Sequence, residues 1–259
     1  YLPPPRGYLG FRGIEGETLT DSMDHVAPPD LKETFTVTRF DTRDEPYFMS
    51  PLGQMFFQPN PWPTEVPELR ESWMPLYRAL DEVATTLMRV MALALDLPEH
   101  FFDDKIDKNI TGLRALNYPH PDTPPRPDQL RASAHTDFGS LTLLSMQDAP
   151  GGLQVHRGGD TWEDVNVPSG MLVMNLGDLM AQWTNDVWIS TLHRVVNPPR
   201  DAVGSTRRQS LAFFHQPNYD AEVITLPSCV TADRPARYER TTSGDHLFMK
   251  MAKANVMTS

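Results

Sequence analysis

The sequence has little of several features that mark large protein classes. A single cysteine, Cys229, excludes a disulfide within the chain and suits a reducing compartment, so we expect a cytoplasmic protein. The net charge is −11 and no basic run occurs, so nucleic acid is not an expected partner. No apolar stretch reaches membrane-spanning length, because Arg89 and Asp96 interrupt the most hydrophobic window. The expected partner is therefore a small molecule, and the oligomeric state is not indicated.

The chain also lacks an initiator Met and the basic and apolar pattern of a signal peptide. We therefore expect further residues before Tyr1. Proline is abundant instead, with 25 residues that concentrate in the first third and near 119–127. This distribution indicates long irregular connections rather than disorder.

Residues 68–97 carry apolar side chains at three- and four-residue steps, from Trp73 to Ala94. This periodicity predicts one long amphipathic helix. Pro75 lies near its start, where it would begin or kink the helix, and Pro98 follows its end.

From about residue 110 the sequence is typical of β-structure. Short apolar runs alternate with clusters of Gly, Pro, Asn and Asp, a spacing that favours a sandwich or barrel. We expect strands at 34–40, 113–118, 140–146, 152–156, 171–176, 189–196 and 210–215, with Gly177-Asp178 forming a turn before the next strand. We therefore assign 1–109 to an irregular and helical region, 110–216 to a β core and 217–259 to a C-terminal tail or lid.

His135 and Asp137 are two residues apart, and side chains at that spacing on an extended backbone point the same way. His193 follows after several strand-like segments. Two imidazoles and one carboxylate are the ligand set of non-haem Fe(II) oxygenases, whereas a structural zinc site normally uses thiolates. Each residue alone has a plainer interpretation, a polar strand end or a buried core histidine.

Arg208 and Ser210 share one face of a further strand. A guanidinium offers a planar fork to a carboxylate, and the hydroxyl adds another donor. Buried inside a barrel, the pair would bind the far carboxylate of a dicarboxylate that lies on the metal. The alternative is an exposed strand start, since Arg207 makes the segment locally hydrophilic.

Five motifs with compatible spacing carry a family resemblance: His-Thr-Asp-Phe-Gly-Ser-Leu-Thr-Leu-Leu (135–144), Gly-Gly-Leu-Gln-Val (151–155), Asn-Leu-Gly-Asp (175–178), Leu-His-Arg-Val-Val-Asn (192–197) and Arg-Gln-Ser-Leu-Ala-Phe-Phe (208–214). The chain resembles the isopenicillin N synthase-like branch of the 2-oxoglutarate/Fe(II)-dependent dioxygenases. The resemblance implies a mainly β fold with some α, in which a double-stranded β-helix (jelly roll) follows a helical and irregular N-terminal region.

The resemblance also implies the roles of the site residues. His135, Asp137 and His193 would hold Fe(II), while Arg208, Ser210 and Tyr118 would bind the distal carboxylate of 2-oxoglutarate. With O2, such an enzyme oxidises an unactivated C–H bond of a small molecule by hydroxylation, desaturation or cyclisation, here in natural-product metabolism. No side chain beyond the metal centre is required as a catalytic base. Phe138, Phe214 and the 183–188 loop, with its two tryptophans, are candidates for the wall of the substrate pocket.

Two other functions remain open at this point. Isopenicillin N synthase itself keeps the Arg-x-Ser pair without using 2-oxoglutarate, so the motif indicates a carboxylate site rather than one particular carboxylate. The second is a catalytically silent jelly-roll binding module, which would keep the fold of the family without its activity. A zinc hydrolase is not favoured, because no glutamate general base accompanies the ligands.

Overall fold

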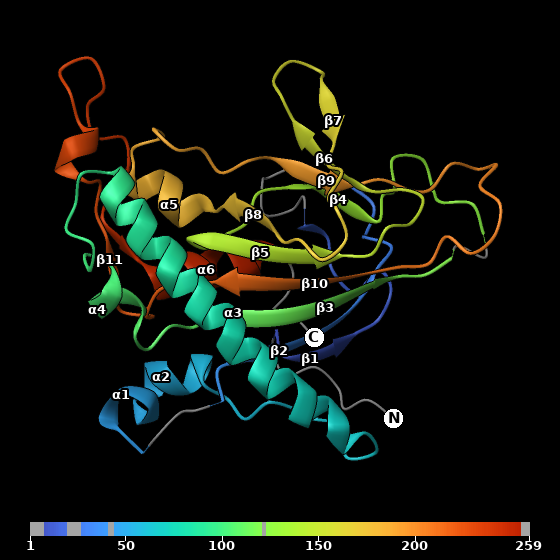
Figure 1. Cartoon of the computed structure of the whole chain (residues 1–259), viewed down its shortest axis with the longest axis horizontal. Helices are drawn as coiled ribbons and strands as arrows, with labels where there is room; N and C mark the ends of the chain where they lie inside the picture. Colours follow the sequence, from blue (N-terminus) through green and yellow to red (C-terminus); the bar gives the residue numbers. More distant parts are fainter. Residues whose placement is uncertain (1–7, 20–26, 41–43, 121–122, 255–259) are drawn as a thin grey trace.

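The computed structural model describes residues 8–19, 27–40, 44–120 and 123–254. Most of its strands belong to two antiparallel sheets (Figure 1). The larger sheet has the order β1 (Gly10–Arg12), β2 (Glu33–Thr38), β3 (Gly112–Tyr118), β10 (Arg208–His215), β5 (Leu141–Met146) and β8 (Val173–Leu176). The smaller sheet has the order β4 (Ala132–His135), β9 (His193–Val195), β6 (Leu153–His156) and β7 (Trp162–Asp164). Strands β11 (Glu222–Val223) and β12 (Thr241–Thr242) form a separate pair.

The helices lie around these sheets. They are α1 (Pro46–Met49), α2 (Pro51–Phe56), α3 (Pro67–Ala94), α4 (Asp103–Ile106), α5 (Asp178–Trp183) and α6 (Ser243–Lys253), with a 3₁₀ turn at Pro227–Cys229. None of the described helices is both long and apolar enough to cross a membrane.

Helix α3 confirms the long amphipathic helix predicted from the sequence, and it crosses the outer face of the larger sheet (Figure 1). Pro75 lies inside the helix rather than at its beginning. The buried face of α3 packs in one core with side chains from alternate positions of the central strands, such as Leu113, Leu143 and Phe213. Burial of this apolar surface fixes α3 to the sheet.

The other face of the larger sheet is turned toward the smaller sheet. Leu116 on β3 and Ala212 on β10 pack in a second core with Ala132, Leu153 and Val195 of the smaller sheet. Because successive side chains of a strand point to opposite faces, each central strand contributes to both cores. The two facing antiparallel sheets confirm the expected jelly roll.

The structure corrects several details expected from the sequence. Gly177-Asp178 does not lead into a strand, because Asp178 begins α5. The strand expected at 189–196 is limited to His193–Val195. Strands β1, β4 and β7 were not expected, and β1 and β2 extend the larger sheet with residues that precede position 110. The proposed division at 109/110 and 216/217 stays a prediction, and its outermost parts, 1–7 and 255–259, lie outside the described residues.

Candidate metal centre and adjoining cavity

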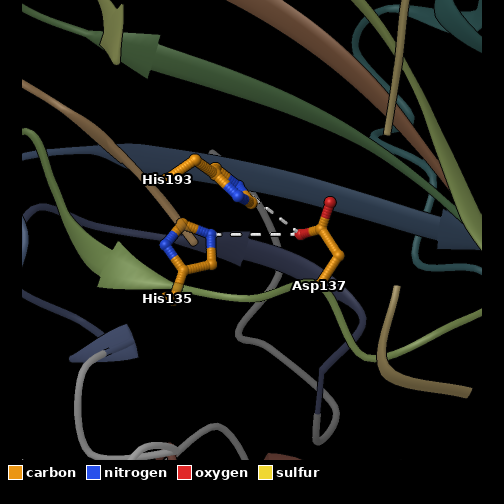
Figure 2. A group of neighbouring side chains, drawn as sticks. All are labelled: His135, Asp137 and His193. Carbon is orange, nitrogen blue, oxygen red and sulfur yellow. Dashed lines mark ion pairs between the residues drawn. The ribbon is translucent and has the colours of Figure 1, made fainter. Parts of the chain in front are cut away.

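The last residue of β4 and the first residue of β9 bring two histidines together. His135 and His193 are paired across the smaller sheet, and Asp137 follows β4 by two residues. Figure 2 shows both rings turned toward the Asp137 carboxylate, with Oδ1 3.8 Å from His193 Nε2 and 4.0 Å from His135 Nε2. One ligand atom from each residue lies within 4.8 Å of the others, and among the described residues this is the group that could hold a metal ion.

Backbone carbonyls orient both imidazole rings in the same way. His135 Nδ1 donates to the Ser133 carbonyl at 2.7 Å, and His193 Nδ1 donates to the Thr191 carbonyl at 2.9 Å. Since a carbonyl only accepts, each Nδ1 carries a proton, and the neutral form of each ring has its lone pair on Nε2. The lone pairs are thus available on the atoms that face Asp137, which is the arrangement a metal requires.

The electrostatics of the site favour the forms that bind metals. Burial, and after it the neighbouring His193 ring, lowers the pKa of His135 to about 4, so the ring is neutral at neutral pH. Burial alone would raise the pKa of Asp137. The two imidazoles outweigh that effect, helped by hydrogen bonds from Asn175 and Thr142, and hold the pKa below its usual range.

Helix α5 fixes the Asp137 loop. The amides of Asp178 and Leu179 donate to the carbonyls of Asp137 and Gly139 at 2.8 and 3.0 Å. Gly177 makes this approach possible, because a Cβ there would lie 2.3 Å from the Gly139 carbonyl oxygen. Asn175 Nδ2 also donates to Asp137 Oδ2 at 2.7 Å. The carboxylate is therefore held before any ligand binds.

Arg208, Ser210 and Tyr118 lie with the three candidate ligands in the wall of one cavity of about 480 Å³. Arg208 pairs with Tyr118 across β10 and β3, and the side chains of both residues face inward. Arg208 is 4% exposed and Ser210 is 8% exposed. The alternative of an exposed strand start is therefore wrong for this segment.

The Arg208 guanidinium has poor hydrogen-bond partners. Its Nη1 donates to the Gly151 carbonyl at 3.3 Å, Nη2 contacts Met146 Sδ at 2.8 Å, and Nε has no partner among the described residues. No carboxylate of the described residues lies within ion-pair distance of it, and burial lowers its pKa, an effect that the Tyr118 hydroxyl and the more distant Asp148 offset only in part. A buried cation without a counter-ion is costly, so a ligand carboxylate fits this position.

The aromatic candidates divide into two groups. Phe138 and Phe214 line the cavity, as proposed from the sequence. Trp183 instead packs in the core beside Phe102, with ring centroids 5.1 Å apart, and Trp188 packs against the same core. The 183–188 loop therefore supplies neither tryptophan to the cavity wall.

Other contacts of the site were not anticipated. Asp30 Oδ1 accepts the Ser133 amide at 2.9 Å, next to the carbonyl that orients His135. Asp30 also pairs with the buried Lys32, whose Nζ lies 2.9 Å from Glu17. Asp30 and Ser133 are 103 positions apart in the sequence, so no local motif signals the contact.

Comparisons with known proteins agree with this geometry. The family model of the 2OG-Fe(II) oxygenase superfamily matches residues 110–217. The 2-oxoglutarate-Fe(II) type oxidoreductase hxnY of Emericella nidulans is 37% identical over 88% of this chain and 65% of its own length. A 2-oxoglutarate-Fe(II) type oxidoreductase, ppzD of Metarhizium majus, is 33% identical over 91% of this chain and 70% of its own.

A solved structure shares the whole architecture. A full-length Neurospora crassa protein in complex with alpha-KG superimposes with a TM-score of 0.78 and 31% identity, over 95% of this chain and 73% of that one. The chain spans less than two thirds of the length of the first curated relatives it matches.

Proposed function

The chain belongs to the 2-oxoglutarate/Fe(II) oxygenase superfamily, and from that premise we propose that it oxidises a C–H bond of a small molecule with 2-oxoglutarate as co-substrate. The observation that carries the proposal is one cavity with a His-Asp-His group and a buried arginine that has no carboxylate partner. A reaction in natural-product metabolism is part of the same proposal.

Membership confirms the family and fold that the sequence motifs implied, and Fe(II), 2-oxoglutarate and O2 are the cofactors that this family uses. The roles of individual residues are proposals. His135, Asp137 and His193 would hold Fe(II), since two neutral imidazoles and a carboxylate are an Fe(II) ligand set. Bound together, the metal and 2-oxoglutarate supply the O2 chemistry that oxidises the substrate.

The chain's own residues would bind the co-substrate and hold the metal ligands in position. Arg208 would receive the distal carboxylate of 2-oxoglutarate on its free N–H groups, with the Ser210 hydroxyl and Tyr118 beside it. Asn175 and the α5 amides keep Asp137 in place during turnover. Phe138 and Phe214 give the cavity an apolar wall that excludes water around the substrate.

The test is release of labelled CO2 and of succinate from 2-oxoglutarate labelled at C1. The Fe(II)-loaded protein should release both slowly without a substrate, because uncoupled turnover needs the metal and co-substrate alone. Asp137→Ala should abolish the release. Asp164→Ala is the matched control, since Asp164 is an exposed carboxylate of the same sheet and should leave the release unchanged.

The outcomes separate the three functions. Release in the wild type and in Asp164→Ala, but not in Asp137→Ala, supports the proposal. Substrate oxidation that proceeds in the complete absence of 2-oxoglutarate would favour the oxidase of the isopenicillin N synthase type. Binding of 2-oxoglutarate without any release, with or without candidate substrates, would favour the silent binding module.

A further inference from the structure

A second arginine, Arg114, faces the cavity that also holds the candidate metal ligands. Alternate residues of β3 line the cavity, namely Gly112, Arg114, Leu116 and Tyr118. Arg114 thus faces the same space as Tyr118, and its side chain is 12% exposed. None of the five sequence motifs includes it.

The position of Arg114 relative to the metal group follows from the strand register. The hydrogen bond between Thr142 and Asp137 ties β5 to the metal group, and Thr142 pairs with Phe214 on β10. The Arg114 guanidinium carbon lies 5.7 Å from the centroid of the Phe214 ring. The Arg114 guanidinium therefore lies at the end of β10 that neighbours Thr142 and, through it, Asp137, whereas Arg208 lies six positions away from Phe214 along β10.

The backbone positions of the two arginines are separated by more than the length of 2-oxoglutarate. Arg114 and Tyr118, the β3 partner of Arg208, are four residues apart, or roughly 13 Å along an extended strand. The carboxylate carbons of 2-oxoglutarate are separated by four carbon–carbon bonds of ~1.5 Å, which span roughly 5 Å. Since the Arg114 guanidinium lies against Phe214, toward the other end of β10 from Arg208, Arg114 faces the space next to the proposed 2-oxoglutarate site, where the primary substrate would lie.

The Arg114 guanidinium still has N–H groups that can bind an anion. Its Nε donates to Thr36 Oγ1 at 2.9 Å, and its Nη1 lies 3.4 Å from both Glu17 oxygens, a long contact. Nη2 has no hydrogen bond within the described part of the chain. Two N–H donors of a guanidinium thus remain for a ligand.

Glu17 is already neutralised. It forms the 2.9 Å ion pair with Lys32, and its side chain is 2% exposed. Burial would raise its pKa, but Lys32 and Arg114 lower the pKa to about 2. Lys32 also pairs with Asp30, so two cations and two carboxylates balance in this group and leave no excess negative charge for a cationic substrate. The cavity wall also includes apolar side chains, namely Ile110, Phe214, Leu247 and Met251, of which Phe214 contacts Arg114.

We infer that Arg114 is the substrate-binding cation of this cavity and that the primary substrate is a small carboxylic acid with an apolar body. The inference rests on the proposed function and adds the class of substrate. The carboxylate binds the free N–H groups of Arg114, and the apolar body lies along Phe214 and Phe138, next to the metal group.

The experiment compares an acid with its uncharged amide on the Fe(II)- and 2-oxoglutarate-loaded protein under anaerobic conditions. The probes are 4-fluorophenylacetate and 4-fluorophenylacetamide, and the readout is the dissociation constant from ¹⁹F line broadening. The acid should bind at least about tenfold more tightly than the amide, and Arg114→Gln should weaken the acid by about tenfold to a hundredfold without affecting the amide. Arg114→Lys should retain part of the preference, because it keeps the charge without the fork.

Arg157→Gln is the matched control, since this arginine also borders the cavity but is 60% exposed and paired with Glu163. It should bind both probes as the wild type does. Equal binding of acid and amide, an unchanged acid affinity in Arg114→Gln, or no binding of either probe at millimolar concentration overturns the inference. The visible charge-transfer band of Fe(II) with 2-oxoglutarate is recorded on each sample. If the wild type lacks that band, the proposed function has failed, whereas an intact band with no acid preference refutes the substrate class alone.

Discussion

Replacing Arg208 by methionine is expected to have opposite effects on co-substrate binding and on the stability of the ligand-free protein. Arg208 is buried, its Nε has no partner among the described residues, and its remaining contacts are the Gly151 carbonyl and a methionine sulfur. Methionine has a similar length and no charge. The substitution therefore removes a buried cation that lacks a counter-ion and, with it, the proposed partner of 2-oxoglutarate.

The magnitudes follow from these contacts. Loss of two charge-assisted hydrogen bonds at ~1.5–3 kcal/mol each should raise the dissociation constant of 2-oxoglutarate by at least a factor of about 100. In the ligand-free protein, relief of the unpaired charge outweighs the loss of the Gly151 contact, since a well-packed apolar replacement of a buried charge stabilises by ~1–4 kcal/mol. The midpoint of thermal unfolding should rise by a few degrees.

The assays are anaerobic titration of 2-oxoglutarate into the Fe(II)-loaded protein and thermal unfolding without ligands. Arg207→Met is the control, because Arg207 precedes Arg208, is exposed and hydrogen-bonds Asn117 through its Nε. It should change neither quantity appreciably. The reasoning would be refuted if Arg208→Met unfolded at a lower temperature than the wild type, or if it bound 2-oxoglutarate as tightly. Either result would mean that Arg208 is not an unpaired cation that binds the carboxylate of 2-oxoglutarate.

Three further predictions concern groups around the site. Asn175→Ala removes the donor to Asp137 Oδ2 and should weaken Fe(II) binding by about 10- to 100-fold, measured by metal titration; unchanged affinity would contradict a positioning role. Burial lowers the pKa of His215 to about 4, so its stabilising effect is complete above pH ~6.5 and is lost as the pH falls toward 4, by up to ~3 kcal/mol. Urea unfolding between pH 7 and 4.5 should therefore show a shallower pH dependence for His215→Asn than for the wild type, and parallel curves would disprove this. Lys250→Met breaks the 2.8 Å ion pair that joins α6 to Asp178 and should speed hydrogen exchange in 243–253 several-fold, whereas an unchanged rate would show that Leu247 and Met251 suffice to hold the helix.

The parts of the site that were predictable from the sequence are those with local signals. The three- and four-residue spacing of 68–97 predicted α3, since helical packing against a sheet imposes that period. The spacing of His135 and Asp137 and the ordered motifs predicted that these two residues lie together with His193, and the structure brings all three together, although Asp137 lies in the loop after β4 rather than in the strand. Phe138 and Phe214 also lie in the cavity wall.

The remaining features depend on contacts between distant segments. Helix α5 begins at Asp178 because Gly177 packs directly on Gly139, a contact that no window around Gly177 contains. Arg114 is the one charged residue of β3, and its place in the cavity depends on the register of β3 against β10. The hydrogen bond from the Ser133 amide to Asp30 likewise forms only when the N-terminal segment lies against β4.

The central claim is that His135, Asp137 and His193 hold one Fe(II) to which 2-oxoglutarate binds. Its most direct test is anaerobic titration of Fe(II) into the protein with excess 2-oxoglutarate, followed by the visible charge-transfer band. The band should saturate at one Fe(II) per chain and be absent in His193→Ala, while His156→Ala, which replaces a partly exposed histidine outside the group, retains it. A band that persists in His193→Ala, or no band in the wild type, would contradict the assignment of these three ligands.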